Sequence, residues 1–155
     1  ADKLGYFKEA GIQIDIQQPP EDGATALVAT GKAQFGVDFQ DYLVPGKTGL
    51  LIGIGGVSMS PLAEVLHDAG LDIRGSDMAE SSNTLTLRER GIPIHIGHSA
   101  DNVTDDISFV IRTAAVHDDN PEVHEAHRRG IPVFERTQAW GALMRGYQNA
   151  LCISG

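Results

Sequence analysis

The stretch of sequence that most constrains the fold runs from residue 50 to residue 66. An apolar run leads into a cluster of glycines, and Leu62, Val65 and Leu66 then recur at the spacing of one helix face. A strand that passes through a tight turn into a helix is the opening of a nucleotide-binding βαβ unit. The sequence therefore predicts a phosphate-binding turn, called here the glycine turn (residues 53–60).

The chemistry of the glycine turn depends on what Gly53 and Gly55 lack. Without a Cβ atom, a diphosphate can approach the main chain, where N–H groups at the start of the following helix point toward it. The usual dinucleotide fingerprint has a third glycine where this chain has Ser58, and an acidic residue about twenty positions on, which Asp77 supplies. A tight turn without any ligand remains an alternative.

Composition excludes several classes of protein. The chain has 155 residues, enough for an ordinary domain with a buried core, and it contains no apolar run long enough to cross a membrane. Its net charge of −9 argues against nucleic acid as the main partner, whereas a nucleotide-sized anion can bind backbone amides. Cys152 is the only cysteine and no signal peptide is visible, so we expect a cytoplasmic protein.

Strands and helices are expected to alternate along the chain. Strands are predicted at residues 12–16, 34–38, 50–54, 71–75, 93–97, 107–112, 131–134 and 150–154. Helices are predicted at residues 1–10, 24–30, 60–68, 81–90, 121–129 and 137–144, with a connector at 39–47. This alternation is typical of an α/β fold, here a Rossmann-like three-layer αβα sandwich with a mainly parallel sheet.

Residues 1–38 repeat the rhythm of residues 61–97, in which a helix, a strand, a helix and a strand follow one another. Both segments would pack naturally beside the strand at 50–54, and they cannot occupy one place. The first segment could add an edge strand, dock beside the last strand or exchange into a second molecule. A monomer and a swapped dimer are therefore both left open.

Residues 49–155 resemble the N-terminal domain of the UDP-N-acetylmuramate:L-alanine ligases, which are Mur ligases of peptidoglycan synthesis. The resemblance rests on motifs at residues 53–60, 75–77, 95–99, 113–116, 119–123 and 130–133. It implies a domain that holds the UDP part of UDP-N-acetylmuramate.

The resemblance also implies which residues would contact the ligand. The glycine turn would face the diphosphate, Ser76 and Asp77 would face the uridine side, and residues 98–99 and 113–115 lie at strand ends, where open α/β sheets bind ligands. The candidate site residues are Gly53, Ile54, Gly55, Gly56, Ser58, Met59, Ser60, Ser76, Asp77, His98, Ser99, Thr113, Ala114 and Ala115.

A metal site is not expected. Glu122, His124, Glu125 and His127 lie at helical spacing, which could suggest metal ligands, but a solvated helix face is the favoured interpretation. No metal and no resident cofactor are predicted.

The Mur ligase resemblance stops at residues 154–155, where that family continues into an ATP-binding P-loop. The sequence Gly46-Lys47-Thr48 does not replace this loop, because the glycine required upstream is Asp41. We therefore expect a domain without catalysis that retains at most weak binding of UDP or UDP-N-acetylmuramate. A NAD-type dinucleotide site and a structural scaffold with an empty site are the alternatives.

Residues 1–45 are similar to a different family, the periplasmic-type binding proteins of thiamine-pyrimidine precursors. The similarity rests on residues 3–12, 31–37 and 40–41 and covers part of one lobe. Because such proteins close two lobes around the ligand, this fragment is not expected to bind a pyrimidine. Two families that meet between residues 45 and 49 predict a chimera, either an engineered recombination or a natural gene fusion.

Overall fold

The computed structural model describes residues 38–148, which is the part of the chain treated below. Residues 39–148 belong to one compact unit. The predictions for residues 1–37 and 149–155 lie outside the described residues. They include the elements expected before Asp38, the last strand at 150–154 and the environment of Cys152.

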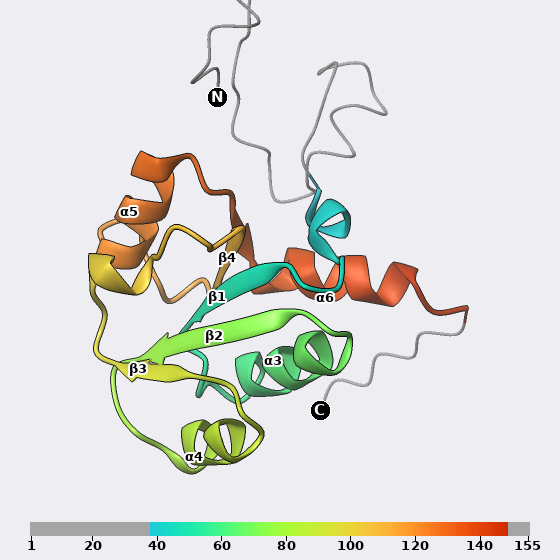
Figure 1. Ribbon diagram of the computed structural model, residues 1–155, viewed down its shortest axis with the longest axis horizontal. Helices are drawn as coiled ribbons and strands as arrows, with labels where there is room; N and C mark the ends of the chain where they lie inside the picture. The colour runs from blue at the N-terminus through green and yellow to red at the C-terminus, as the bar shows by residue number, and fades with distance from the viewer. Residues whose placement is uncertain (1–37, 149–155) are drawn as a thin grey trace, which may run out of the picture. The chain divides into compact units, whose positions relative to one another are not determined.

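Five strands of the described part form one parallel sheet in the order β3-β2-β1-β4-β5 (Figure 1). The strands are β1 (Thr48–Ile52), β2 (Asp72–Asp77), β3 (Ile94–Ile96), β4 (Phe109–Arg112) and β5 (Val133–Glu135). The prediction of a mainly parallel sheet is confirmed, although β1 ends two residues earlier than expected and β2 continues two residues further, to Asp77.

The central strand β1 is buried along its whole length because strands pair with both of its edges and helices cover both faces of the sheet. Leu51 points into the larger hydrophobic core, and Leu50 and Ile52 point into a smaller core on the other face. A strand covered on both faces is rich in apolar side chains, which explains the apolar run of residues 50–52. Of residues 61–97, strand β2 pairs with one edge of β1, and β4 pairs with the other edge.

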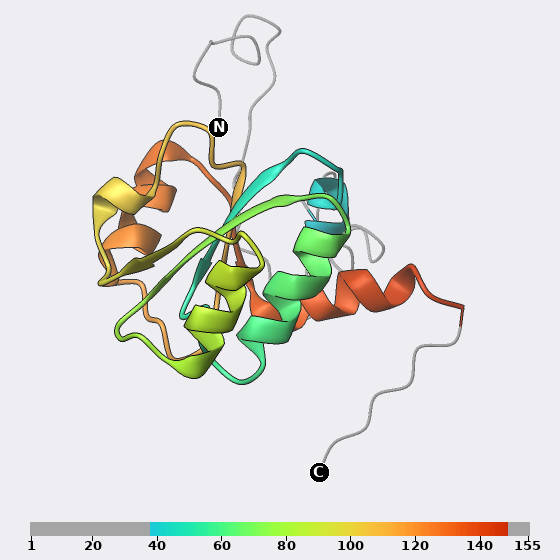
Figure 2. The same cartoon turned by 60° about the horizontal axis from the view of Figure 1, so that its bottom comes forward.

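Helices cover both faces of the sheet, so the three-layer αβα architecture is also confirmed. One face carries η1 (Phe39–Tyr42), α3 (Met59–Asp68), α4 (Ser82–Glu89) and α6 (Arg136–Arg145), and the other carries η2 (Ala100–Asn102) and α5 (Pro121–Arg129). Figure 2 shows α3 and α4 side by side, with the sheet between them and α5. No helix among residues 38–148 is both long and apolar enough to cross a membrane.

Local capping explains where two of these helices begin. Ser81 accepts a hydrogen bond from the N–H of Thr84 at the start of α4, and Thr84 accepts one from the N–H of Ser81. Asn120 accepts from the N–H of Glu122 at the start of α5, where Pro121 is the first helical residue. The predicted bounds 121–129 of α5 are confirmed.

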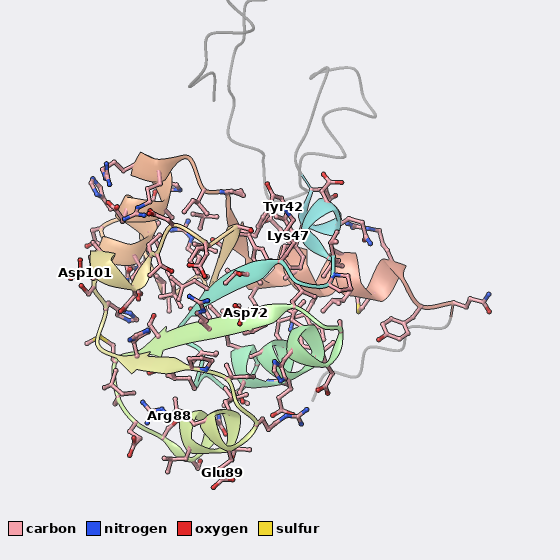
Figure 3. The ribbon with its side chains drawn as sticks, viewed as in Figure 1. Tyr42, Lys47, Asp72, Arg88, Glu89 and Asp101 are labelled. Atoms are coloured by element: carbon pink, nitrogen blue, oxygen red, sulfur yellow. The ribbon has the colours of Figure 1, made fainter. Side chains whose placement is uncertain are left out.

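The predicted connector at 39–47 was incomplete, because its first four residues form η1. In a 3₁₀ helix, side chains at positions i and i+3 lie on the same side, as Phe39 and Tyr42 do here (Tyr42 is labelled in Figure 3). The Phe39 ring packs edge-on against Phe109 and Phe134, with centroids 5.2 and 5.3 Å apart. Phe39 and Tyr42 therefore contribute to the core that covers β4 and β5.

Candidate functional site

The candidate site lies where the five strands end at their carboxyl edge. After β1 the chain builds β2 and β3 outward on one side, and it then returns to place β4 and β5 on the other side of β1. The connections that leave β1 and β4 thus diverge in opposite directions, and such a switch point is the usual ligand crevice of an open α/β sheet. The glycine turn follows β1, and Thr113 follows β4.

Most of the N–H groups in the glycine turn are used to hold its own shape. Gly53, with φ of 76°, and Ile54 both donate to the carbonyl of Ser76, at 2.8 and 3.0 Å. The N–H groups of residues 56, 59 and 60 donate to carbonyls within the turn. Among residues 38–148, no partner is recorded for the N–H groups of Val57 and Ser58, so these two amides are available to an anion.

Two side chains hold Gly55 from opposite sides. Asp77 Oδ2 accepts from the Gly55 N–H at 2.8 Å, and Asn83 Nδ2 donates to the Gly55 carbonyl oxygen at 2.8 Å. The Asp77 carboxylate therefore supports the turn, and its expected contact with the uridine side stays a prediction. Asn83 was not among the predicted site residues, so sequence reasoning missed this contact.

A buried polar cluster lies beside the ends of β2 and β3, and we call it the Glu122 cluster (Ser76, His98, Asn102 and Glu122). Ser76 Oγ donates to Glu122 Oε2 at 2.8 Å, His98 Nδ1 lies 2.7 Å from the same oxygen, and Asn102 Nδ2 donates to Oε1 at 2.6 Å. A carboxylate accepts only, so Nδ1 of His98 carries the proton of this hydrogen bond. This leaves Nε2 as the ring nitrogen that can meet a ligand.

Sequence reasoning named Ser76 and His98 as candidate site residues but missed Glu122. The prediction of a solvated helix face is wrong for Glu122, which is 0% exposed, and for Glu125, which is 8% exposed; His124 and His127 are exposed. Glu122 is the second residue of α5 and lies one turn before the buried Ala126, on the face that packs on the sheet. The spacing of four residues between Glu122 and the apolar Ala126 was the sequence signal that Glu122 lies on the buried face of the helix.

The other predicted site residues are placed differently. Ile54 and Met59 are 0% exposed and Ser60 is 6% exposed, so their side chains belong to the core. Ser99 accepts from the N–H of Asp101 and caps η2. Thr113 is half-buried, and Ala114 and Ala115 are exposed in the turn that follows β4. A ligand role for these residues remains a prediction.

Arg136 is a residue of the site that sequence reasoning did not consider. It is the first residue of α6, directly after β5, and its Nη1 donates to Ser58 Oγ of the glycine turn. Its position directly after a predicted strand was a signal in the sequence, because the candidate residues came from the ends of the other four strands.

The helix once considered for a metal uses its buried carboxylate in ion pairs. Glu125 accepts from Arg128 at 2.7 Å and from Arg129. These hydrogen bonds, with Arg128 the larger cause, lower the pKa of Glu125 from 4.5 to about 2. Within residues 38–148, no group of three or more histidine, cysteine or carboxylate side chains is arranged to hold a metal ion.

This lowered pKa predicts an acid-dependent loss of stability. The contribution of Glu125 to the free energy of unfolding is present in full above pH 4.5 and is lost as the pH falls toward 2, because the unfolded chain binds the proton first. We expect Glu125→Gln to be less stable than the wild type at pH 7 and to lose less stability across this window. Urea unfolding followed by circular dichroism at pH 7, 4.5, 3.5 and 2.5 measures both effects.

The control for this experiment is Glu89→Gln, which changes an exposed carboxylate at the end of α4 (Figure 3). Its stability should follow the wild-type curve through the acid range. Parallel pH curves for Glu125→Gln and the wild type would contradict the assignment of the low pKa to Glu125.

Two family models match the sequence. Residues 51–148 match the family described as Mur ligase family, catalytic domain. Residues 1–74 match a second family, described as NMT1/THI5 like, so the two matches overlap over residues 51–74.

Curated proteins similar to the chain carry the name UDP-N-acetylmuramate–L-alanine ligase. The protein of Agathobacter rectalis is 47% identical over 104 residues, which are 67% of this chain and 23% of that protein. The protein of Caldicellulosiruptor saccharolyticus is 48% identical over 105 residues, which are 68% of this chain and 23% of that protein. The chain thus spans less than a quarter of the length of these relatives.

Solved structures share the fold. A UDP-N-acetylmuramate-alanine ligase from Thermotoga maritima is similar at a TM-score of 0.62 and 38% identity, over 64% of this chain and 23% of that chain. A murein peptide ligase from Psychrobacter arcticus 273-4 is similar at a TM-score of 0.61 and 19% identity, over 65% of this chain and 21% of that chain.

Proposed function

The chain belongs to the Mur ligase family, and on that premise we propose that its glycine turn binds the diphosphate of UDP-N-acetylmuramate. The observation that carries the proposal is the position of this turn at the β1/β4 switch point, with the N–H groups of Val57 and Ser58 unpaired among the described residues. Such amides at the start of a helix bind phosphate oxygens without needing a net positive protein. The names of the similar proteins supply the ligand.

The uridine is proposed to extend from the turn toward the ends of β2 and β3. Support comes from His98, whose Nδ1 is held by the buried Glu122 and whose Nε2 is left for a ligand. A fixed ring with one defined donor or acceptor suits recognition of a base or a ribose better than a freely rotating surface histidine. The proposed role is binding alone.

We also infer that the chain combines segments of two families, as an engineered recombination or a natural fusion. The two family matches support this. They overlap over residues 51–74, so the second match continues past the expected joint. The joint was expected between residues 45 and 49. Phe39 and Tyr42 pack on Phe109 and Phe134, so a joint between the two segments must preserve this packing.

The binding proposal is tested by titrating the ¹⁵N-labelled full chain with UDP-N-acetylmuramate, UDP and NAD, and following the amide signals. We expect the two UDP ligands to shift signals of residues 53–60, Asp77 and His98, with NAD giving no comparable change. Shifts with NAD at the same residues would favour the dinucleotide alternative. A well-dispersed spectrum that no ligand changes would reject the binding proposal and leave a structural scaffold.

A further inference from the structure

We propose that Arg136 is the cation that anchors the diphosphate at the glycine turn, and that it exchanges its hydrogen bond to Ser58 for one to a phosphate oxygen. This inference rests on the proposed nucleotide function of the same turn. Arg136 would supply the positive charge that favours a charged diphosphate, and the neutral backbone amides of the glycine turn carry no such charge.

The first observation is the place of Arg136 in the fold. It follows β5 directly, so it leaves the sheet at the same carboxyl edge as the glycine turn, although β4 lies between β5 and β1. Its Nη1 reaches Ser58 Oγ, 78 positions earlier in the sequence and immediately before α3. The guanidinium therefore lies beside the Ser58 amide that we assign to the phosphate.

The second observation is that Arg136 has no carboxylate partner recorded within residues 38–148. Six other arginines of this region form ion pairs with carboxylates, namely Arg74, Arg88, Arg90, Arg112, Arg128 and Arg129. The one recorded partner of Arg136 is a neutral hydroxyl, which uses one of the five N–H donors of a guanidinium.

The third observation concerns the helices. Arg136 is the first residue of α6, and its side chain reaches the N-terminus of α3, so the guanidinium lies near the positive ends of two helix dipoles. A cation is unfavourable at such a position and an anion is favourable there. A diphosphate would interact favourably with both dipoles and with the guanidinium, whose planar donors match phosphate oxygens.

The experiment compares Arg136→Met and Arg136→Lys with the wild-type full chain, using UDP and uridine as probes in nuclear magnetic resonance titrations. We expect Arg136→Met to weaken UDP binding about tenfold or more, the effect of losing a charged hydrogen bond. Uridine binding should stay unchanged in this variant, and Arg136→Lys should be intermediate for UDP. The matched control is Arg90→Met, which removes an arginine paired with Glu64 and Asp68; it should bind UDP like the wild type.

A second measurement on the wild type separates this inference from the proposed function. Sodium pyrophosphate should shift the Nε–Hε signal of Arg136, which is assigned by its loss in Arg136→Met. Equal UDP affinity of Arg136→Met and the wild type would overturn the inference and leave the proposed function standing. Failure of the wild type to bind UDP would reject the proposed function, and Arg136 would then be rejected as an anion site only if pyrophosphate also left its signal unmoved.

Discussion

Replacing Gly75 by alanine is expected to lower the free energy of unfolding by about 3 kcal/mol, an overpacking cost. A Cβ atom on Gly75 would lie 2.4 Å from Ile54 Cδ1, 2.7 Å from its Cβ and 2.8 Å from its Cγ2. Ile54 is 0% exposed, and its N–H donates to the Ser76 carbonyl, so it cannot move aside without pulling the glycine turn off β2. Urea unfolding followed by circular dichroism measures the change.

The same substitution at Gly141 is the matched control, with the opposite expected sign. Gly141 lies inside α6, and a Cβ atom there meets nothing within 4 Å, so alanine should raise stability by about 0.5–1 kcal/mol through its helix propensity. The double variant Gly75→Ala/Ile54→Ala should cost less than the sum of the single variants, because the clash is relieved. Gly75→Ala with wild-type stability would contradict the close approach of the turn to β2.

Periodicity and punctuation were sufficient to predict the architecture of the described region. Apolar runs marked its five strands, and the predicted start of α5 at Pro121 is confirmed. The 3₁₀ helix η1 was missed because its place in the core depends on long-range packing. Phe39 and Tyr42 lie between glycines and prolines in a segment that looks like a linker, and only their packing on Phe109 and Phe134 shows that η1 belongs to the core.

The candidate site was predictable in position but less so in chemistry. Glycine spacing and strand ends indicated where a ligand would lie, since parallel strands bring their carboxyl ends to one edge. Which amides stay unpaired depends on long-range hydrogen bonds, such as that between Gly55 and Asp77. The partners of Ser58 and His98 come from residues 78 and 24 positions away, Arg136 and Glu122, and no local pattern in the sequence encodes such contacts.

Replacing Glu122 by alanine is expected to lower the free energy of unfolding by about 3 kcal/mol or more. The Glu122 side chain is 0% exposed and accepts from Ser76, His98 and Asn102, so its removal takes an acceptor from each of them. Asn102 keeps the Gly97 carbonyl as a second acceptor. Each buried donor left unsatisfied costs about 1–3 kcal/mol, and water entering the space offsets part of the sum. Urea unfolding at pH 7 measures the loss.

Two further variants separate the hydrogen bonds of Glu122 from the general effect of a substitution. Glu122→Gln keeps the shape and one acceptor oxygen for three donors, so we expect an intermediate loss of about 1–2 kcal/mol. Glu89→Ala, at the exposed end of α4, should stay within about 0.5 kcal/mol of the wild type. Equal stability of Glu122→Ala and the wild type would contradict the buried cluster.

The Glu122 cluster also decides how stability and binding are linked in this fold. Its four residues lie at the end of β2, in the connection after β3, on η2 and on α5, so one carboxylate fixes four segments at the edge where the uridine is proposed to lie. We therefore expect Glu122→Gln, under conditions where it is folded, to bind UDP more weakly than the wild type while pyrophosphate binding is unchanged. An equal loss for both probes would mean that the cluster supports the whole edge of the sheet rather than the nucleoside side alone.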